Sequence, residues 1–266
     1  MNKIHPLACV SPEAKLGDNV EIGPFAFVDA NVEIGDGCRI LNGASIYNHV
    51  RMGKDCTVFP GAVVGAIPQD LKYEGEESWV EIGDRVNIRE CATINRGTKA
   101  SGKALTRIGS DTLIMSYAHI AHDCQVGNHC IVVSYSGLAG ETVMEDWSVV
   151  GGQSGSHQFC RVGTHSFVGA RCKITKDVPP YILAGREPLA FEGVNRVGLS
   201  RRGFSEEKIN EIKAIYNTLY FQGMNVSDAC AYIESIFSQS EERDAILGFI
   251  RNSKRGIIFP PKAPRR

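Results

Sequence analysis

The sequence predicts a mainly β protein, with a parallel β-helix over residues 1–177 and a connecting segment and small α-helical domain over residues 178–266. Three observations predict the β-helix: a large aliphatic residue recurs every six positions, glycine often follows it, and a small residue lies four positions beyond it. Neither the period of an α-helix nor that of an alternating strand produces this repeat. Repeats of six residues are typical of a parallel β-helix.

The aliphatic positions predict the path of the β-helix. The run stops at Asp70, resumes at Ile82, and continues from Ile108 to Ile174 with one lapse at Ser156. Three hexads would form one triangular coil with the aliphatic residues inside, which gives roughly ten coils stacked about 4.8 Å apart. The glycine that follows suits a turn, because glycine accepts backbone angles that other residues resist. The pattern resembles the left-handed hexapeptide-repeat family and so implies a left-handed helix. The first part of the run comprises Ile4, Val10, Leu16, Ile22, Val28, Ile34, Ile40, Ile46, Met52, Val58 and Val64.

The chain has nine cysteines but no CxxC motif. Six of them fall on the small inward position of the repeat, where free cysteine acts as a small hydrophobe. We therefore expect these thiols to pack in the core, with no disulfide and no cysteine metal site. The six are Cys38, Cys56, Cys124, Cys130, Cys160 and Cys172.

Composition excludes several classes of protein. Lys and Arg total 29 and Asp and Glu total 30, so the charge of −1 gives no reason to expect nucleic acid or an anionic membrane as partner. No stretch approaches the roughly 18 apolar residues of a membrane span. The N-terminus shows no apolar segment of a secretory signal, so we expect a cytoplasmic protein.

Two polar segments interrupt the repeat, at residues 66–81 and 96–107. Each should leave the coil as a loop and return to it. Loops on a rigid scaffold often carry binding residues. We therefore expect part of a functional site here.

The repeat ends at residues 177–180, which read Asp-Val-Pro-Pro, and helical patterns follow an irregular segment. Ser205 is a predicted N-cap of the first helix, and Gly223 is its stop signal. Ser227 and Ser240 are predicted to open the second and third helices.

Two histidines, His119 and His122, lie off the inward positions of an uninterrupted part of the repeat. Residues 18 apart stack on successive coils, so His122 should lie beside Gly140 and then Gln158. With Asp123 adjacent, this arrangement suits a general base next to a backbone oxyanion donor. From the residues alone, surface histidines without a role explain the pattern equally well.

Several motifs occur together along nearly the whole chain. They are Gln69-Asp70-Leu71-Lys72-Tyr73, Ile94-Asn95-Arg96-Gly97-Thr98, residues 119–123, Leu138-Ala139-Gly140, His157-Gln158-Phe159, Asp177-Val178-Pro179-Pro180-Tyr181, Gly193-Val194-Asn195 and Arg201-Arg202-Gly203-Phe204. In this order and spacing they resemble the UDP-N-acetylglucosamine O-acyltransferase family of the lipid A pathway.

The resemblance implies transfer of an (R)-3-hydroxyacyl chain from acyl carrier protein to the 3-hydroxyl of UDP-N-acetylglucosamine. His122 would be the general base, Asp123 would orient it, and the Gly140 amide would stabilise the oxyanion. The family also implies a homotrimer with its sites between chains, direct transfer without an acyl-enzyme, and no metal or cofactor beyond the phosphopantetheine of the carrier.

The resemblance assigns further residues to binding. Those for the sugar and acyl groove are Gln69, Asp70, Lys72, His119, His157 and Gln158, and those for the nucleotide end are Asn195, Arg201 and Arg202. Arginine suits phosphate through its planar fork of donors. Because acyl carrier protein is acidic, a basic strip is also expected. Its candidates are Arg161, Arg171, Lys173, Lys176, Arg196, Arg201 and Arg202.

Four departures from the family pattern affect recognition. Glu141 and Asn95 stand where histidine is common, and residues 186–191 read Arg-Glu-Pro-Leu-Ala-Phe where the family often has Gly-Asn-His-Ala-Thr-Pro. Ala170 stands where glycine is common. We expect the size of Ala170 to help limit the length of the acyl chain.

Other functions stay open on the sequence. A related acyltransferase could use a UDP 3-amino sugar and form an amide instead of an ester. A zinc hydratase of the same fold would need a third histidine beside His119 and His122, from His129, His157 or His165. A structural solenoid without catalysis is the third alternative, although its two polar loops and tandem arginines would then have little use.

Overall fold

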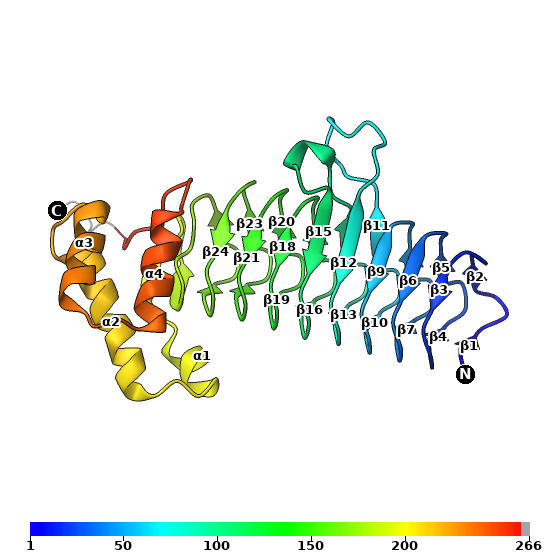
Figure 1. Cartoon of the computed structure of the whole chain (residues 1–266), viewed down its shortest axis with the longest axis horizontal. Coiled ribbons are helices and arrows are strands. Elements are labelled where there is room, and N and C mark those ends of the chain that lie inside the picture. Colours follow the sequence, from blue (N-terminus) through cyan, green and yellow to red (C-terminus); the bar gives the residue numbers. More distant parts are fainter. Residues whose placement is uncertain (262–266) are drawn as a thin grey trace.

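The computed structural model describes residues 1–261 and confirms the predicted fold, a left-handed β-helix with a helical domain at its C-terminal end (Figure 1). Short strands form three parallel sheets, one on each side of a triangular prism. The coils of the prism provide nine strands to the second sheet. There are therefore about nine coils where about ten were predicted, because the two loops take up residues that the estimate assigned to coils.

The first sheet holds β1 (Lys3–Ile4), β4 (Glu21–Ile22), β7 (Arg39–Ile40), β10 (Thr57–Val58), β13 (Asn87–Ile88), β16 (Leu113–Ile114), β19 (Ile131–Val132), β22 (Val149–Val150), β25 (Phe167–Val168), β27 (Ile182–Gly185) and β28 (Ala190–Val194). The second holds β2 (Cys9–Val10), β5 (Phe27–Val28), β8 (Ser45–Ile46), β11 (Val63–Ala66), β14 (Thr93–Asn95), β17 (His119–Ile120), β20 (Gly137–Leu138), β23 (Gly155–Ser156) and β26 (Lys173–Ile174). The third holds β3 (Lys15–Leu16), β6 (Val32–Ile34), β9 (Val50–Met52), β12 (Trp79–Ile82), β15 (Leu105–Ile108), β18 (Gln125–Val126), β21 (Val143–Met144) and β24 (Arg161–Val162).

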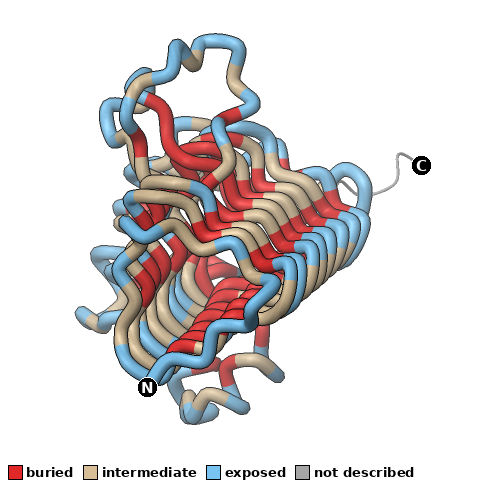
Figure 2. The backbone as a smooth tube through the Cα atoms, turned by 90° about the vertical axis from the view of Figure 1, so that its right-hand side faces the viewer, coloured by how far each residue is buried: buried red, intermediate tan, exposed pale blue. Residues whose placement is uncertain are grey.

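Large aliphatic side chains fill the prism, as the repeat predicts. Ile40, Ile46 and Val58 are fully buried, and the six cysteines at the small inward position are buried with them. In Figure 2, buried positions recur at the same place on successive coils and so form rows along the prism. All nine cysteines are free thiols. Burial of these apolar side chains is the main force that holds the prism together.

The glycines after the aliphatic residues have a different role from the one predicted. The residue with positive φ lies three positions after the aliphatic residue, as at Asn19 (56°) and Asp55 (55°). After most strands of the third sheet, glycine directly follows the aliphatic residue, and the coils stack closely there. A Cβ on Gly35 would lie only 2.6 Å from the carbonyl oxygen of Gly53 on the next coil. At these positions the turn interpretation was therefore wrong, because close approach between coils is the reason for glycine; Gly65, with a φ of 82°, is an exception that does adopt a turn conformation.

Two loops leave the prism at one corner, the turn that follows strands of the second sheet, which we call the loop corner. Loop 1 (residues 67–78) joins β11 to β12, and loop 2 (residues 96–104) joins β14 to β15 and contains a 3-10 turn at Lys99–Ser101. The strands extend into both predicted excursions, so each loop is shorter than expected. Figures 1 and 2 show the two loops side by side beyond the coils.

The first sheet extends past the predicted boundary at residue 177. β27 pairs with β25, and β28 returns antiparallel beside β27. Four helices follow: α1 (Arg196–Arg201), α2 (Glu206–Phe221), α3 (Val226–Ile236) and α4 (Glu241–Arg251).

The helix caps agree only in part with the sequence pattern. Ser205 and Ser240 cap α2 and α4 as predicted, whereas α3 is capped by Asn225, whose side chain accepts the amide of Asp228. Ser227 therefore lies inside α3. None of the helices in the described part of the chain has the length and apolarity that a bilayer crossing requires.

Candidate active site

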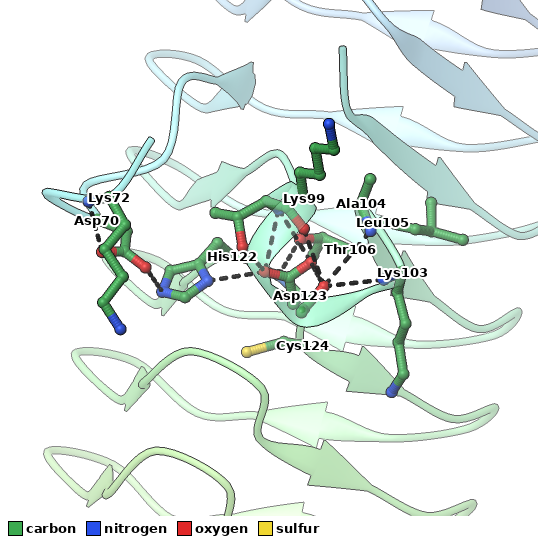
Figure 3. Close-up of polar contacts among 12 residues, drawn as sticks. Asp70, Lys72, Lys99, Lys103, Ala104, Leu105, Thr106, His122, Asp123 and Cys124 are labelled. Carbon is green, nitrogen blue, oxygen red and sulfur yellow. Dashed lines mark hydrogen bonds and ion pairs between the residues drawn. The ribbon is translucent and has the colours of Figure 1, made fainter. Parts of the chain in front are cut away.

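His122 and Asp123 lie at the loop corner, directly after β17. His122 Nδ1 is 2.8 Å from Asp123 Oδ2, and both residues are buried (Figure 3). A carboxylate only accepts hydrogen bonds, so Nδ1 carries the proton in this contact. The Nε2 atom of the neutral ring then keeps a free lone pair, which is the form that a general base needs.

Loop 1 brings a second carboxylate to the opposite side of the ring. Asp70 Oδ2 lies 3.7 Å from His122 Nε2, and Asp70 Oδ1 accepts the backbone amide of Lys72 (Figure 3). The Gln69 and Lys72 side chains are exposed on the same loop. Loop 1 therefore places these three predicted residues at the loop corner with His122.

Gly140 stacks on His122 one coil further along. A Cβ at Gly140 would lie 2.4 Å from both Cε1 and Nε2 of His122, so only glycine leaves room for the ring. Within residues 1–261, no group accepts a hydrogen bond from the Gly140 amide. This amide is therefore unpaired and lies next to the free Nε2 of His122.

The corner that follows strands of the third sheet shows what such an amide can bind. We call it the stack corner. The equivalent amides there donate to side-chain oxygens from the next coil: Asn128 to Asp146 at 2.8 Å, and Lys54 to Asp84 at 2.8 Å. A backbone amide at this position of the coil can thus donate a hydrogen bond to an oxygen atom that lies beside it. Beside Gly140 that place is left for an external oxygen, because a different residue, exposed Gln158, occupies the next coil.

The outer surface of the second sheet adjoins His122. His119 Nδ1 is 2.7 Å from the Thr93 hydroxyl, and burial lowers the pKa of His119, with a further effect from the charge of His122. In the strand register, His119 is followed by Gly137 and then Gly155. A Cβ at Gly137 would meet no atom within 4 Å. The sheet surface beyond His119 is therefore a bare strip.

His157 and Gln158 lie two coils from His122 at the same corner, both exposed. Within residues 1–261, the one side-chain hydrogen bond of this pair joins His157 Nδ1 to the Gln158 carbonyl at 3.1 Å. Ala170 is exposed at the turn between β25 and β26, and β26 pairs with β23 beside the bare strip. His157 and Gln158 thus extend the loop-corner group toward the C-terminal coils, whereas Ala170 lies at a different corner, between the first and second sheets.

The residues predicted for the nucleotide end lie elsewhere. Asn195 caps α1 and donates to the His165 carbonyl at 2.9 Å, and the Arg202 guanidinium lies 5.2 Å from the Trp147 ring centre. Arg202 Nη1 is 3.3 Å from His165 Nδ1. Burial lowers the pKa of Arg202, and burial together with the charge of Arg202 lowers the pKa of His165 to about 4. These groups belong to the stack corner, so one chain does not bring them to His122.

Sequence reasoning missed the aromatic stack at this corner. The His129 and Trp147 rings are 3.9 Å apart, the Trp147 and His165 rings 6.0 Å, and the His165 and Tyr181 rings 5.7 Å. The 18-residue spacing of His129, Trp147 and His165 was the signal that could have revealed it. These histidines serve as stacking partners, away from His119 and His122.

Loop 2, which the sequence marked as a candidate binding loop, supplies two residues to which the sequence assigned no role. Thr98 and Ser101 donate hydrogen bonds to the Asp123 carboxylate. No periodicity connects residue 98 or 101 with residue 123, because the loop leaves the repeat.

The structure places three of the departures from the family pattern. Asn95 is buried and its Nδ2 donates to the Ile67 carbonyl at 2.8 Å, which anchors the start of loop 1. The Glu141 amide donates to the His122 carbonyl at 3.0 Å. Residues 186–191 form the β27–β28 hairpin, which lines a groove of about 840 Å³ together with Lys173 and Lys176.

Only part of the predicted basic strip is available for a partner. Arg161 pairs with Glu145 at 2.7 Å, and Arg196 pairs with Glu206 at 2.7 Å. Arg202 is stacked on Trp147. The exposed candidates that remain are Arg171, Lys173, Lys176 and Arg201.

The outside of the first sheet carries an apolar groove of about 720 Å³. Ile131, Val149, Phe167 and Leu183 form its floor, one from each successive strand. Asn195, Val197, Arg201 and Arg202 border it on the α1 side. An apolar surface of this kind marks an interaction site.

Comparisons with known proteins agree with this arrangement. The family described as UDP-N-acetylglucosamine O-acyltransferase, domain 2, matches residues 177–258, and the bacterial transferase hexapeptide family matches residues 105–140. The acyl-[acyl-carrier-protein]–UDP-N-acetylglucosamine O-acyltransferase of Thiobacillus denitrificans is 47% identical over 97% of this chain and 100% of its own. The relative of the same name from Pseudomonas syringae is 49% identical over 97% and 100%.

Solved structures give the same result. A UDP-N-acetylglucosamine acyltransferase from Bacteroides fragilis shares 50% identity and superposes with a TM-score of 0.93, covering 96% of this chain and 99% of that one. The corresponding protein from Acinetobacter baumannii shares 38% identity with a TM-score of 0.92, over 96% and 99%. The family inferred from the sequence motifs is thereby confirmed. The chain is an acyltransferase and belongs to the UDP-N-acetylglucosamine O-acyltransferase family.

Proposed function

We propose that the chain transfers an (R)-3-hydroxyacyl group from acyl carrier protein directly to the 3-hydroxyl of UDP-N-acetylglucosamine, the first step of lipid A biosynthesis. The relatives are named for this donor and acceptor. The observation that carries the mechanism is the loop corner, where His122 Nε2 is free, Asp123 holds Nδ1, and the Gly140 amide is unpaired beside them.

His122 Nε2 accepts the proton of the sugar hydroxyl as its oxygen attacks the thioester carbonyl carbon. The negative charge that develops on the carbonyl oxygen accepts a hydrogen bond from the Gly140 amide. When this tetrahedral species collapses, the C–S bond breaks, and the His122 imidazolium returns the proton to the departing thiolate of the carrier. Asp123 stabilises the imidazolium between the two transfers. The product is an ester, and no acyl-enzyme forms.

The bare strip on the second sheet suits the acyl chain. Gly137 and Gly155 leave the sheet surface without side chains next to His119. Ala170 lies at the turn before β26 and would limit the length of chain that the strip accepts. Asp70, Lys72, Gln158 and His157 would line the sugar and acyl groove at the loop corner.

The nucleotide end requires a second copy of the chain. Asn195 and Arg202 lie at the stack corner and Arg201 lines the apolar groove of the first sheet, so these residues would complete the site on a neighbouring copy in a homotrimer. The apolar groove on the first sheet supports this packing, because it borders the same residues. Sedimentation should therefore give the mass of three chains; a stable monomer with full activity would contradict it.

The acidic carrier protein would dock near the C-terminal coils. Arg171, Lys173 and Lys176 are exposed there, and the groove beside the β27–β28 hairpin lies next to them. The carrier's phosphopantetheine would bring the acyl group, and the chain needs no cofactor of its own. This donor and acceptor agree with a cytoplasmic location, which stays a prediction.

Acyl transfer by purified protein tests the proposal. UDP-N-acetylglucosamine and a UDP 3-amino sugar are offered as acceptors, with 3-hydroxyacyl carrier proteins of graded length as donors. We expect ester formation that falls at least about a thousandfold in His122→Ala, because the base is lost. His5→Ala, at an exposed histidine, is the matched control and should be unaffected. Ala170→Gly should shift the preference toward longer donors.

Two outcomes would contradict the mechanism or the acceptor. Normal activity of His122→Ala would exclude His122 as the base. Transfer only to the 3-amino sugar would correct the acceptor while leaving the site in place.

A further inference from the structure

Loop 2 holds the Asp123 carboxylate from the side away from His122. The Thr98 amide donates to both carboxylate oxygens at 3.0 Å, the Thr98 hydroxyl donates to Oδ2 at 2.7 Å, and the Ser101 hydroxyl donates to Oδ1 at 2.6 Å. Asp123 is fully buried. With the His122 contact, every hydrogen-bonding direction of this carboxylate is used.

Two residues at the start of loop 2 hold it close to Asp123. A Cβ at Gly97 would lie 2.1 Å from the Leu105 amide nitrogen and 2.7 Å from Asp123 Oδ1, so only glycine lets the loop pass so close. The preceding Arg96 is buried, and its Nη1 lies 2.6 Å from Asn48 Oδ1 on the coil. The entry to the loop is therefore fixed on both sides.

Loop 2 is also joined to loop 1. Arg96 Nη2 donates to the Tyr73 hydroxyl at 3.2 Å, and the Lys99 amide donates to Glu76 Oε1 at 2.9 Å. Backbone amides, that of Lys99 first and those of Glu74 and Glu76 after it, lower the pKa of Glu76. The two carboxylates that flank His122, Asp70 and Asp123, are thus both held by this pair of loops. Figure 3 shows them on opposite sides of the ring.

We propose that Thr98 and Ser101 are positioning residues of the acyl transfer. They act through Asp123: they fix the direction of its carboxylate and share its negative charge, so that Oδ2 remains on His122 Nδ1 while the ring gains and loses a proton. A rotation of the carboxylate would break the contacts with Thr98 and Ser101 together. Partners that orient a group in contact with the reacting residue commonly affect activity strongly. This inference rests on the proposed function.

A purely structural role predicts different behaviour. If loop 2 merely closed the corner, loss of a hydroxyl would lower the unfolding free energy and leave the pH dependence unchanged. If it orients the base, loss of the Thr98 hydroxyl leaves more negative charge on Asp123. The protonated ring of His122 is then stabilised relative to the neutral ring.

Isosteric replacement of Thr98 separates the two roles. Thr98→Val should lower kcat about tenfold with little change in KM, because the base is misdirected after the substrate has bound. The acid limb of the kcat/KM profile should move to higher pH. Thr98→Ser, which keeps the hydroxyl, should restore both. The matched control is Thr112→Val, a buried threonine on another coil corner that should keep the wild-type profile.

A double-mutant cycle with Asp123→Ala gives the decisive readout. If Thr98 acts through Asp123, Thr98→Val should have no further effect on kcat once the carboxylate is removed. Ser101→Ala should behave in the same way and serves where Thr98→Val folds poorly.

Equal effects of Thr98→Val in the presence and absence of Asp123, or an unshifted pH profile, would overturn the inference. If His122→Ala remains active, the proposed function itself fails. If His122→Ala is inactive while Thr98→Val and Ser101→Ala match wild type, only the positioning role is wrong.

Discussion

The loop corner and the stack corner are built by the same six-residue repeat, yet their backbone amides differ in whether they have a hydrogen-bond acceptor. At the stack corner, coil amides donate to oxygens of the next coil, as Asn128 does to Asp146, and the His165 and Trp147 rings stack. At the loop corner, the Gly140 amide has no acceptor within the described chain, and His122 lies between two carboxylates.

The difference lies in the side chains that follow one coil later. The repeat places an outward backbone amide on every coil. Where the next coil carries an Asp or Asn at the equivalent position, its side-chain oxygen accepts a hydrogen bond from this amide and links the two coils. Where that residue is Gln158 and the preceding coil carries His122, the same amide stays open beside a base. The candidate site therefore uses the ordinary coil backbone, and it combines a base, His122, with an amide that lacks the usual acceptor.

The largest expected effect comes from Gly140→Ala, which should displace the His122 ring from its place beside the Gly140 amide. The new Cβ would overlap the His122 ring, whose Cε1 and Nε2 atoms lie 2.4 Å from that position. We expect kcat/KM for acyl transfer to fall at least about a hundredfold, since displacement of a reacting group by about 1 Å has this effect. Gly248→Ala, where a Cβ meets no atom within 4 Å, is the control. Activity within a few-fold of wild type would show that the reaction occurs elsewhere.

A smaller effect concerns the pH dependence of stability, which should show that His165 is buried and neutral at the stack corner. The pKa of His165 is lowered from 6.5 to about 4 by burial and by Arg202. Above pH 6.5 His165 is neutral in both folded and unfolded chains; as pH falls toward 4 only the unfolded chain gains the proton, so the free energy of unfolding decreases.

His165→Phe keeps an aromatic ring but cannot titrate. Its unfolding free energy should fall less than that of wild type between pH 7 and pH 4, by on the order of 1–2 kcal/mol. Chemical denaturation at both pH values measures this difference. The same replacement at exposed His5 serves as control, and parallel curves for wild type and His165→Phe would refute the buried neutral state.

The smallest effect concerns stability and one hydrogen bond between coils at the stack corner, from the Asn128 amide to Asp146. Asp146→Ala removes the acceptor of the Asn128 amide and should lower the free energy of unfolding by about 1 kcal/mol. Asp146→Asn keeps an acceptor oxygen and should lose less. Acyl transfer should be unchanged in both. A strong loss of activity in Asp146→Ala, with its stability intact, would mean that Asp146 itself takes part in substrate binding or catalysis and does not only link two coils.

The sequence was enough to predict the fold and the pairing of His122 with Gly140. Both follow from regularity: inward residues recur every six positions, and residues 18 apart must stack. The same spacing would have revealed the stacking of His129, Trp147 and His165. By contrast, the reason for the glycines depends on distances between coils, which a periodic pattern does not contain.

The contacts of the loops could not be predicted from the sequence. Thr98 and Ser101 reach Asp123 only because loop 2 folds back over the coil, and its path depends on Arg96, Gly97 and loop 1. The place of Arg202 on Trp147 likewise depends on the short helix α1, which has too few residues for a recognisable period. These contacts depend on tertiary structure outside the repeat.

The central claim is that the unpaired Gly140 amide is the oxyanion donor. A variant that gives this amide an acceptor from the chain itself tests the claim most directly. Gln158 occupies the position relative to Gly140 that Asp146 occupies relative to Asn128. Gln158→Asp should therefore place a carboxylate oxygen on the Gly140 amide, fill the oxyanion position and lower kcat by about a hundredfold. Gln158→Ala, measured beside it, should raise KM and keep kcat within a few-fold. Equal kcat values for the two variants would contradict the assignment of the Gly140 amide as the oxyanion donor.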